Sequence, residues 1–185
     1  MRNQYKVLAE KYEQVLEADQ EPVMTVNKNG DKEWRLNGKL HRLDGPAIER
    51  ADGSEFWFHN GYIHRLDGPA VKFANGNTVW KRHGKFHRLD GPAAEYHLLG
   101  KEWWQNGKRH RLDGPAVEYA ADGFKRWYLN GKLHRDDGPA VIYGTGDKEY
   151  WLDYKEYTKD KFNKEIQHRN ILKRASDETG IEMDI

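Results

Sequence analysis

Histidine, arginine and aspartate recur together in a fixed order along this chain, and all three carry side chains that take part in chemistry. The heptapeptide HRLDGPA occurs four times and the variant HRDDGPA once. Imidazoles bind transition metals, guanidinium groups grip phosphates, and carboxylates beside imidazoles are parts of many active sites. The recurring residues are His41, Arg42, Asp44, His64, Arg65, Asp67, His87, Arg88, Asp90, His110, Arg111, Asp113, His134, Arg135 and Asp137.

Repetition of these residues argues against catalysis. An active site needs a nucleophile, a base and an orienting group that converge at one place, whereas each candidate here recurs five times. With two principal strands per repeat, ~4.8 Å apart, equivalent histidines would lie about 10 Å apart, while zinc lies about 2.1 Å from a ligating nitrogen. We therefore expect no catalytic residue, no metal site and no cofactor. Each motif histidine is expected to satisfy backbone groups at its corner.

The motif arginines stand two residues before the motif aspartates, and this spacing leaves two interpretations open. One is a charge-assisted pair that braces each repeat. The other is a row of arginines that grips the phosphates of a nucleotide or nucleic acid. Because every arginine has an acid in the same turn, most of the attraction that phosphate binding requires is cancelled. We favour the brace and expect no nucleic-acid partner.

The elements that position these residues can be read from the repeat. The motif histidines follow one another at steps of 23, 23, 23 and 24 residues, and a tryptophan stands seven residues before each. Between them lies Asn-Gly in four repeats and His83-Gly84 in the third, dipeptides that favour two-residue hairpin turns with positive φ. Alternating apolar and polar residues after the motif, as in residues 116–119, indicate a return strand. Each repeat therefore predicts two strands around a turn, a DGP corner and a return strand.

The predicted fold class is mainly β, an elongated antiparallel sheet of β-hairpin repeats capped by an N-terminal and a C-terminal α-helix. The helices are expected over residues 1–20 and 159–175, the second with Thr158 as its N-cap. Five full repeats, with a half repeat at each end, occupy residues 21–158, and residues 176–185 form an acidic, solvated tail. Seven Trp, ten Tyr and six Phe predict that aromatic side chains carry the core.

Charge, cysteine count and hydropathy limit the function classes. The net charge is +1 at pH 7, so no overall field draws the chain to nucleic acid or to an anionic membrane. The absence of cysteine excludes disulfides, thiolate zinc sites and cysteine nucleophiles. There is no signal-peptide pattern and no apolar run long enough to span a bilayer. These features predict a soluble, cytoplasmic protein.

The repeats resemble a known family over about residues 21–158. The period of 23 residues, the aromatic residue, the NGK of residues 37–39, the following histidine and the closing Asp-Gly are similar to membrane occupation and recognition nexus (MORN) repeats. MORN units usually continue His-Gly-x-Gly, whereas every unit here continues His-Arg-x-Asp-Gly-Pro-Ala, a variant that resembles repeat proteins of bacteriophages and bacteria. The resemblance implies a row of β-hairpins used for scaffolding, dimerisation or partner recognition, without catalytic residues.

One variable position in each repeat is a candidate for binding a partner. The residue after each repeat tryptophan faces away from it by strand alternation, and variable positions of repeat arrays can encode specificity. Three of these residues are aromatic and predict an exposed patch, which binds a partner, packs on a terminal helix or lies in a homodimer interface. The candidate partner-binding residues are Arg35, Phe58, Lys81, Trp104 and Tyr128.

Three functional hypotheses follow. The first is a non-enzymatic binding or scaffold protein that recognises a protein partner through its sheet face, for example a phage or bacterial accessory protein that inhibits or recruits a host factor such as a defence component. The second is a small-ligand or nucleotide-sequestering protein, with pockets of arginine and aromatic residues formed by oligomerised repeats. The third is a peripheral membrane scaffold, against which the balanced charge and the lack of a basic amphipathic helix argue.

Overall fold

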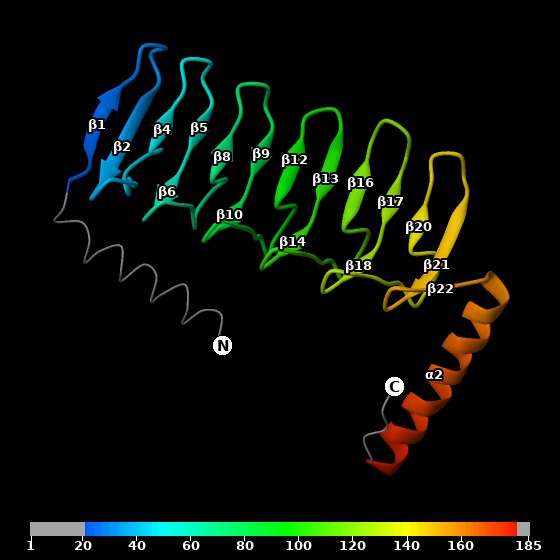
Figure 1. The fold of residues 1–185 in the computed structure, drawn as a ribbon. Helices are drawn as coiled ribbons and strands as arrows, with labels where there is room; N and C mark the ends of the chain where they lie inside the picture. Colours follow the sequence, from blue (N-terminus) through cyan, green and yellow to red (C-terminus); the bar gives the residue numbers. More distant parts are fainter. Residues whose placement is uncertain (1–20, 181–185) are drawn as a thin grey trace. The chain divides into compact units, whose positions relative to one another are not determined.

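The computed structural model describes residues 21–180, and the chain divides after Lys108 into two compact units. The mainly β architecture is confirmed, because short antiparallel strands fill both units and one helix follows them in the second (Figure 1). The helix predicted over residues 1–20 lies outside the described residues. No helix within residues 21–180 is both long and apolar enough to cross a bilayer.

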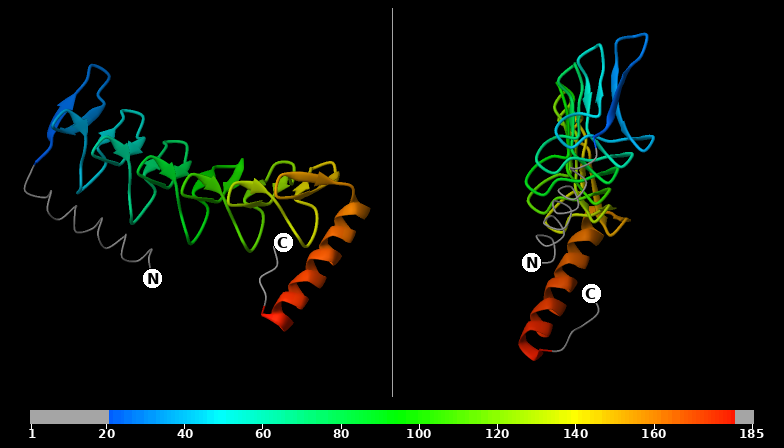
Figure 2. Two further views of the ribbon diagram at one scale, coloured as in Figure 1. Left: turned by 60° about the horizontal axis from the view of Figure 1, so that its bottom comes forward. Right: turned by 90° about the vertical axis from the view of Figure 1, so that its left-hand side faces the viewer.

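The first unit is an antiparallel sheet with small hairpins attached. Its strands are β1 (Val23–Val26), β2 (Lys32–Leu36), β3 (Lys39–Leu40), β4 (Ile48–Glu49), β5 (Glu55–Phe56), β6 (Phe58–His59), β7 (Tyr62–Ile63), β8 (Val71–Lys72), β9 (Thr78–Val79), β10 (Lys81–Arg82), β11 (Lys85–Phe86), β12 (Ala94–Tyr96), β13 (Gly100–Glu102) and β14 (Trp104–Gln105). The sheet order is β1-β2-β4-β5-β8-β9-β12-β13, while β6-β7 and β10-β11 pair separately. Successive repeats of this unit have the same outline in Figure 2.

Each leading strand changes partner at the repeat tryptophan. Before Trp57, β5 pairs with β4 and β8, and after it β6 pairs with β7. The backbone N–H of Trp57 donates to the carbonyl of Ala70 at 2.9 Å, and the backbone carbonyl of Trp57 accepts the N–H of His64 at 3.0 Å. The same two backbone bonds recur at Trp34 and Trp80. The tryptophan is therefore the point where the sheet ends and the hairpin begins.

The hairpin turns have the predicted conformation. Asn60 and Gly61 have φ of 51° and 86°, and His83 and Gly84, which break the Asn-Gly pattern, have φ of 47° and 75°. Both central residues thus lie in the left-handed region that a type I′ turn requires. Each tip also bonds to the preceding hairpin, since Gly61 donates its N–H to Leu40 at 2.8 Å and Gly84 to Ile63 at 2.9 Å. Neighbouring hairpins are therefore joined through their backbones.

The second unit has the same plan and ends in a helix. Its elements are β16 (Val117–Tyr119), β17 (Lys125–Arg126), β18 (Tyr128–Leu129), β19 (Lys132–Leu133), β20 (Val141–Ile142), β21 (Lys148–Leu152), β22 (Lys155–Tyr157) and α2 (Lys159–Thr179), while β15 (Lys108–Arg109) spans the division of the units. The sheet order is β16-β17-β20-β21-β22, with β18-β19 as a separate hairpin.

The C-terminal helix begins where predicted and ends later. The Thr158 hydroxyl accepts the N–H of Lys161 at 3.4 Å, which confirms the N-cap. The helix ends at Thr179 rather than at residue 175, because Gly180 takes a left-handed conformation with φ of 68° and donates its N–H to the carbonyl of Ser176. Near its start, the buried Phe162 ring lies 5.1 Å from Tyr150 in β21, so the helix packs on the last hairpin.

The prediction that aromatic residues carry the core holds only in part, because aromatic side chains such as Tyr143 and Trp151 pack against the buried cluster without filling it. The fully buried residues are mainly small and aliphatic, and the alanine of the motif is 0% exposed in every repeat, at Ala47, Ala70, Ala93, Ala116 and Ala140. The repeat tryptophans are only half-buried. Corner and sheet backbones come together at these alanines, and the carbonyls of Ala47, Ala70, Ala93 and Ala140 accept the backbone N–H of the tryptophan in the same repeat. A longer side chain does not fit in so narrow a space.

Candidate functional site

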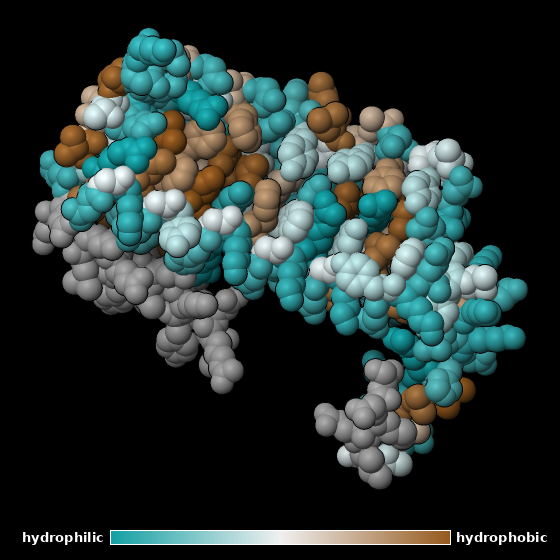
Figure 3. Space-filling model, in the orientation of Figure 1, coloured by the Kyte–Doolittle hydropathy of each residue, from teal (hydrophilic) through white to brown (hydrophobic). Residues whose placement is uncertain are grey.

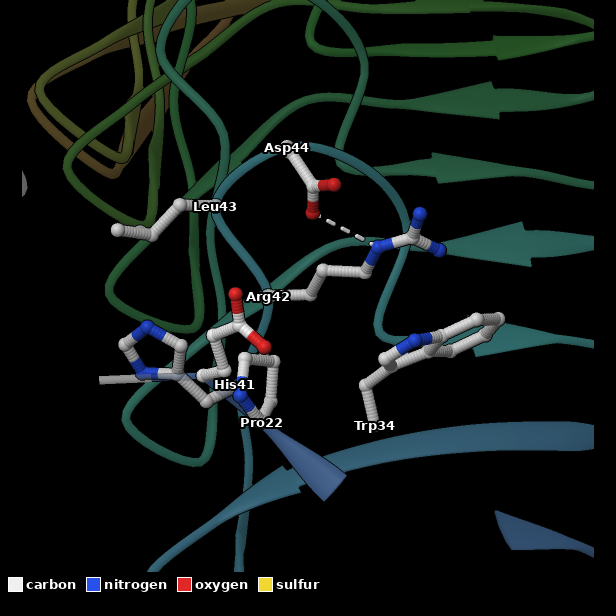
Figure 4. A pocket seen from close by; sticks show the side chains of 7 residues that line it. Pro22, Trp34, His41, Arg42, Leu43 and Asp44 are labelled. Atoms are coloured by element: carbon white, nitrogen blue, oxygen red, sulfur yellow. Dashed lines mark hydrogen bonds and ion pairs between the residues drawn. The ribbon is translucent and has the colours of Figure 1, made fainter. Parts of the chain in front are cut away.

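The HRxDGP segments fold into corners, and at Arg42, Arg65, Arg88 and Arg135 the arginine lies on the repeat tryptophan. The guanidinium carbon of Arg42 is 4.1 Å from the centre of the Trp34 ring, and Figure 4 shows Arg42 above this indole and directed toward Asp44. The corresponding distances are 4.3 Å for Arg65 and Trp57, 4.1 Å for Arg88 and Trp80, and 4.1 Å for Arg135 and Trp127. This stacking was not predicted from the sequence.

Hydrogen bonds hold each guanidinium in place from two sides. Arg88 Nε donates to Asp90 Oδ1 at 2.9 Å, and Arg88 Nη1 donates to the Pro92 carbonyl at 3.2 Å and to Glu95 Oε1 at 3.4 Å. The bonds from arginine to the aspartate and to the proline carbonyl are present in all five corners. The geometry is that of a local brace, with the arginine held inside its own repeat.

The motif glycine closes the other face of the guanidinium. A Cβ added to Gly68 would lie 2.7 Å from Arg65 Cζ, and one added to Gly45 would lie 2.8 Å from Arg42 Cζ. The guanidinium is therefore enclosed between an indole face and a glycine. Lack of space for a Cβ is therefore the reason that the structure shows for glycine at this position.

The motif histidines link neighbouring repeats. The backbone N–H of the turn residue in the next repeat donates to Nδ1 of each motif histidine, at 3.3 Å for His41, 3.2 Å for His64, 3.1 Å for His87, 3.0 Å for His110 and 3.2 Å for His134. The sequence predicted that each histidine would satisfy backbone groups within its own corner. The structure does show a backbone partner for each histidine, but this partner lies in the following hairpin.

Two histidines outside the motif extend this arrangement in the first unit. His59 lies between His41 and His64 with ring centres 5.0 and 5.6 Å away, and His83 lies 4.5 Å from His64. The estimate of about 10 Å between histidines considered only the motif positions and missed these intervening rings. Over residues 21–180, no three His, Asp or Glu side chains converge in the way that a metal ion needs.

Grooves lie beside the corners of the first unit, one against Glu21 and Pro22 and the other between two neighbouring corners. One has a volume of about 410 Å³ and the other of about 320 Å³. Each is lined by tryptophan, histidine, arginine, leucine and aspartate from the same places of the repeat, namely Trp34, His41, Arg42, Leu43 and Asp44, and Trp80, His87, Arg88, Leu89 and Asp90. Arg65, Leu66 and Asp67 form the opposite wall of the second groove. We call these hollows the corner grooves.

The third residue of the motif is the exposed apolar part of each corner. Leu43, Leu89 and Leu112 are 39%, 57% and 83% exposed, and Figure 4 shows Leu43 directed away from Asp44. Asp136 takes this place in the fifth corner, yet that corner keeps its stacked Arg135 and the bond from Arg135 to Pro139 at 3.3 Å. Leucine at this position is therefore not needed to form a corner.

The exposed aromatic patch predicted after the repeat tryptophans is not formed. Phe58, Trp104 and Tyr128 are half-buried. Trp104 stacks on Phe86 at 5.2 Å, and its indole N–H donates to the buried Glu102 at 2.8 Å. The prediction assumed an uninterrupted strand, but the change of partner at the tryptophan places the next residue in the hairpin. A role of these residues in partner binding stays a prediction.

The remaining members of that set also have neighbours within the chain. Arg35 Nη2 lies 2.8 Å from Glu33 Oε2, and Lys81 Nζ lies 4.6 Å from the centre of the Phe86 ring. Tyr128 packs against the cluster of Leu133, Ala140 and Val141. Hydrophobic side chains on the face seen in Figure 3 are interspersed among hydrophilic ones.

The aspartates of the corners are held ionised. The hydrogen bond from Arg88 lowers the pKa of Asp90 below its ordinary value, and the same bond from the preceding arginine lowers the pKa of Asp44, Asp113 and Asp137. A carboxyl group with a lowered folded-state pKa stabilises the fold above its unfolded pKa, about 3.9, and loses this effect as the pH falls further. The corners thus present fixed negative charges at neutral pH.

This linkage predicts how Asp90→Asn behaves with pH. Urea denaturation should show the variant less stable than wild type at pH 6, because the ionised partner of Arg88 is lost. The difference should shrink below about pH 4 as Asp90 becomes protonated in wild type. Since Asp90 is 82% exposed, the effect at pH 6 should be small. Asp136→Asn is the control, and a difference between Asp90→Asn and wild type that does not change with pH would contradict the assignment.

Comparisons with known proteins do not add a family to this description. No family model matches the chain, and no curated protein matches it at a significant level. The plain conclusion is therefore architectural, an antiparallel β-hairpin repeat with a C-terminal helix.

Proposed function

We propose that the chain is a non-enzymatic binding protein that recognises a protein partner through the corner grooves of its repeats. The observation that carries this proposal is the leucine of the motif. It recurs in four corners and is exposed in three of them, although the corner with Asp136 forms the same contacts without it. Folding does not account for an exposed leucine at this place, and rows of exposed apolar residues mark interaction surfaces.

The chemistry of the grooves supports binding over turnover. Both grooves share the tryptophan, histidine, arginine, leucine and aspartate of one corner, and a set of groups that recurs from corner to corner is not a unique reacting set. Every motif arginine is held by an aspartate and a proline carbonyl of its own repeat. A guanidinium committed in this way is a poor ligand for free phosphate. This favours a protein partner over the nucleotide-sequestering alternative.

The resemblance to MORN repeats extends the proposal to a biological setting. Its HRxDGPA variant supports an accessory protein of a bacteriophage or bacterium, acting in the cytoplasm to inhibit or recruit a host factor such as a defence component. The repeats would serve as the scaffold and the corner grooves as the contact surface.

A variant that copies the fifth corner tests this function. The triple variant carries Leu43→Asp, Leu66→Asp and Leu89→Asp. It gives three other corners the aspartate that the fifth corner has at position 136, so the free energy of unfolding should change by less than about 1 kcal/mol. In affinity capture from bacterial lysate with mass spectrometry, we expect wild type to retain a stoichiometric protein and the triple variant to lose it.

The matched control is Leu99→Asp, which changes a leucine about as exposed as Leu89 in the turn between β12 and β13. This turn lies at the edge of the sheet away from the β6-β7 and β10-β11 hairpins (Figure 1). The control should capture the same protein as wild type. Equal capture by the triple variant, or no captured protein with wild type, would overturn the proposed function.

A further inference from the structure

The spacing of the corner grooves restricts the shape of what can occupy them. In the first unit each repeat contributes two neighbouring strands to the sheet, so successive repeats are about 9.6 Å apart. Each corner follows this spacing because its backbone bonds to the next repeat, with Arg42 donating its N–H to Phe58 and Arg65 to Lys81, both at 3.1 Å. A chain that lies along the corners must therefore present equivalent side chains every ~9.6 Å.

Among regular backbones, polyproline II fits this spacing best. It has three residues per turn and rises ~3.1 Å per residue, so every third side chain lies on one edge about 9.3 Å apart. An α-helix presents the same face after seven residues, about 10.5 Å. Over two repeats, its side chains fall out of step with the ~9.6 Å spacing of the corners by roughly 1.8 Å, whereas those of polyproline II do so by only about 0.6 Å. In a β-strand, side chains on one face repeat at about 6.7 Å or multiples of it, which do not match.

The walls of the grooves suit a proline-rich segment that also carries basic residues. Leu66 and Leu89 face the groove that contains Trp80 and His87, which offers apolar and aromatic surface to a pyrrolidine ring. Asp67 and Asp90 stand beside these leucines with side chains 81% and 82% exposed. Each of these carboxylates accepts a hydrogen bond from its own arginine at 2.9 Å, but it lies mostly in solvent, whereas the Arg88 side chain is only 21% exposed, so a cation can reach the carboxylate.

From this geometry we infer that the corner grooves bind a polyproline II segment with an apolar residue or proline at every third position and arginine or lysine between them. The inference rests on the proposed function and names its partner class. Each repeat accepts one turn of the ligand. The leucines contact the rings, and the aspartates pair with the basic side chains.

Synthetic peptides test this directly, with intrinsic tryptophan fluorescence of the full chain as readout. We expect (Pro-Pro-Arg)4 to bind wild type, and (Pro-Pro-Glu)4 and the out-of-register (Pro-Pro-Gly-Arg)3 not to bind. The Leu43→Asp, Leu66→Asp, Leu89→Asp variant should bind (Pro-Pro-Arg)4 at least about tenfold more weakly, because its apolar contacts are lost. This variant adds three negative charges, so binding by charge alone would become tighter instead.

Other results would overturn the inference. They are tighter or unchanged binding of (Pro-Pro-Arg)4 by the triple variant, equal binding of the out-of-register peptide, and preference for an amphipathic helix with leucine at every seventh position. If lysate capture depends on the corner leucines while (Pro-Pro-Arg)4 fails to bind, the inference falls and the proposed function stands. If (Pro-Pro-Arg)4 binds through the leucines but capture does not depend on them, the proposed function falls.

Discussion

Trp80→Ala should lower the free energy of unfolding of the first unit by about 3 kcal/mol. The indole is the surface on which Arg88 rests at 4.1 Å, and Arg88 in turn holds Asp90 and the Pro92 carbonyl. Removing the ring leaves the guanidinium without its platform and opens a cavity beneath the corner. Urea denaturation followed by circular dichroism measures the loss, and the transition should also broaden because contacts between neighbouring repeats weaken.

Tyr62→Ala provides the matched control. Tyr62 is also an aromatic residue of the repeat region, but it lies in β7 and is 60% exposed. Its removal should cost less than about 1 kcal/mol, since exposed side chains contribute little. Similar losses for Trp80→Ala and Tyr62→Ala would show that the stacked arginine does not hold the corner together.

Gly68→Ala should destabilise the first unit by about 2 kcal/mol, through side-chain collision alone. The new methyl group would lie 2.7 Å from Arg65 Cζ, so the guanidinium must leave the Trp57 ring. The cost combines a lost cation–π contact of roughly 1 kcal/mol with a weakened hydrogen bond to Asp67 of about the same size. The backbone is not the cause, because the φ of Gly68 does not lie in the left-handed region.

Two comparisons separate this cause from others. Gly138→Ala is the equivalent change in the fifth corner, where the nearest atom, Arg135 Cζ, would be 3.3 Å away, so its cost should be clearly smaller. In the background of Arg65→Ala, the change Gly68→Ala should add almost nothing, because the guanidinium that it meets is gone. Additive losses in this double-mutant cycle would contradict the enclosed arginine.

Period and turn chemistry made much of the fold predictable. Steps of 23 residues, the Asn-Gly turns and the N-cap at Thr158 anticipated the hairpins and the start of α2. These features are local, since a type I′ turn or a helix cap depends on a few adjacent residues. Even the His83-Gly84 turn could be placed, because its position in the repeat outweighs its unusual composition.

The side-chain packing inside the corner was harder to predict because it depends on contacts between residues that are distant in the sequence. Nothing in the order of residues indicates that Arg88 stacks on Trp80 or that a glycine limits the space above it. The alternation rule failed at Trp104 because the leading strand changes partner at Trp103, a change set by hydrogen bonds to other strands. One signal was available for the groove, namely the recurrence of leucine in four corners and its replacement by Asp136 in the fifth.

The bonds that join one repeat to the next affect how such a repeat protein can evolve. The arginine brace lies within a single repeat, while its neighbours are reached through the backbone N–H groups that meet histidine Nδ1 and through the N–H groups of the hairpin tips. Backbone groups are the same in every repeat, so a copied repeat brings its own brace and finds a matching neighbour on either side. Gene duplication or deletion of whole repeats can therefore lengthen or shorten the array without compensating substitutions.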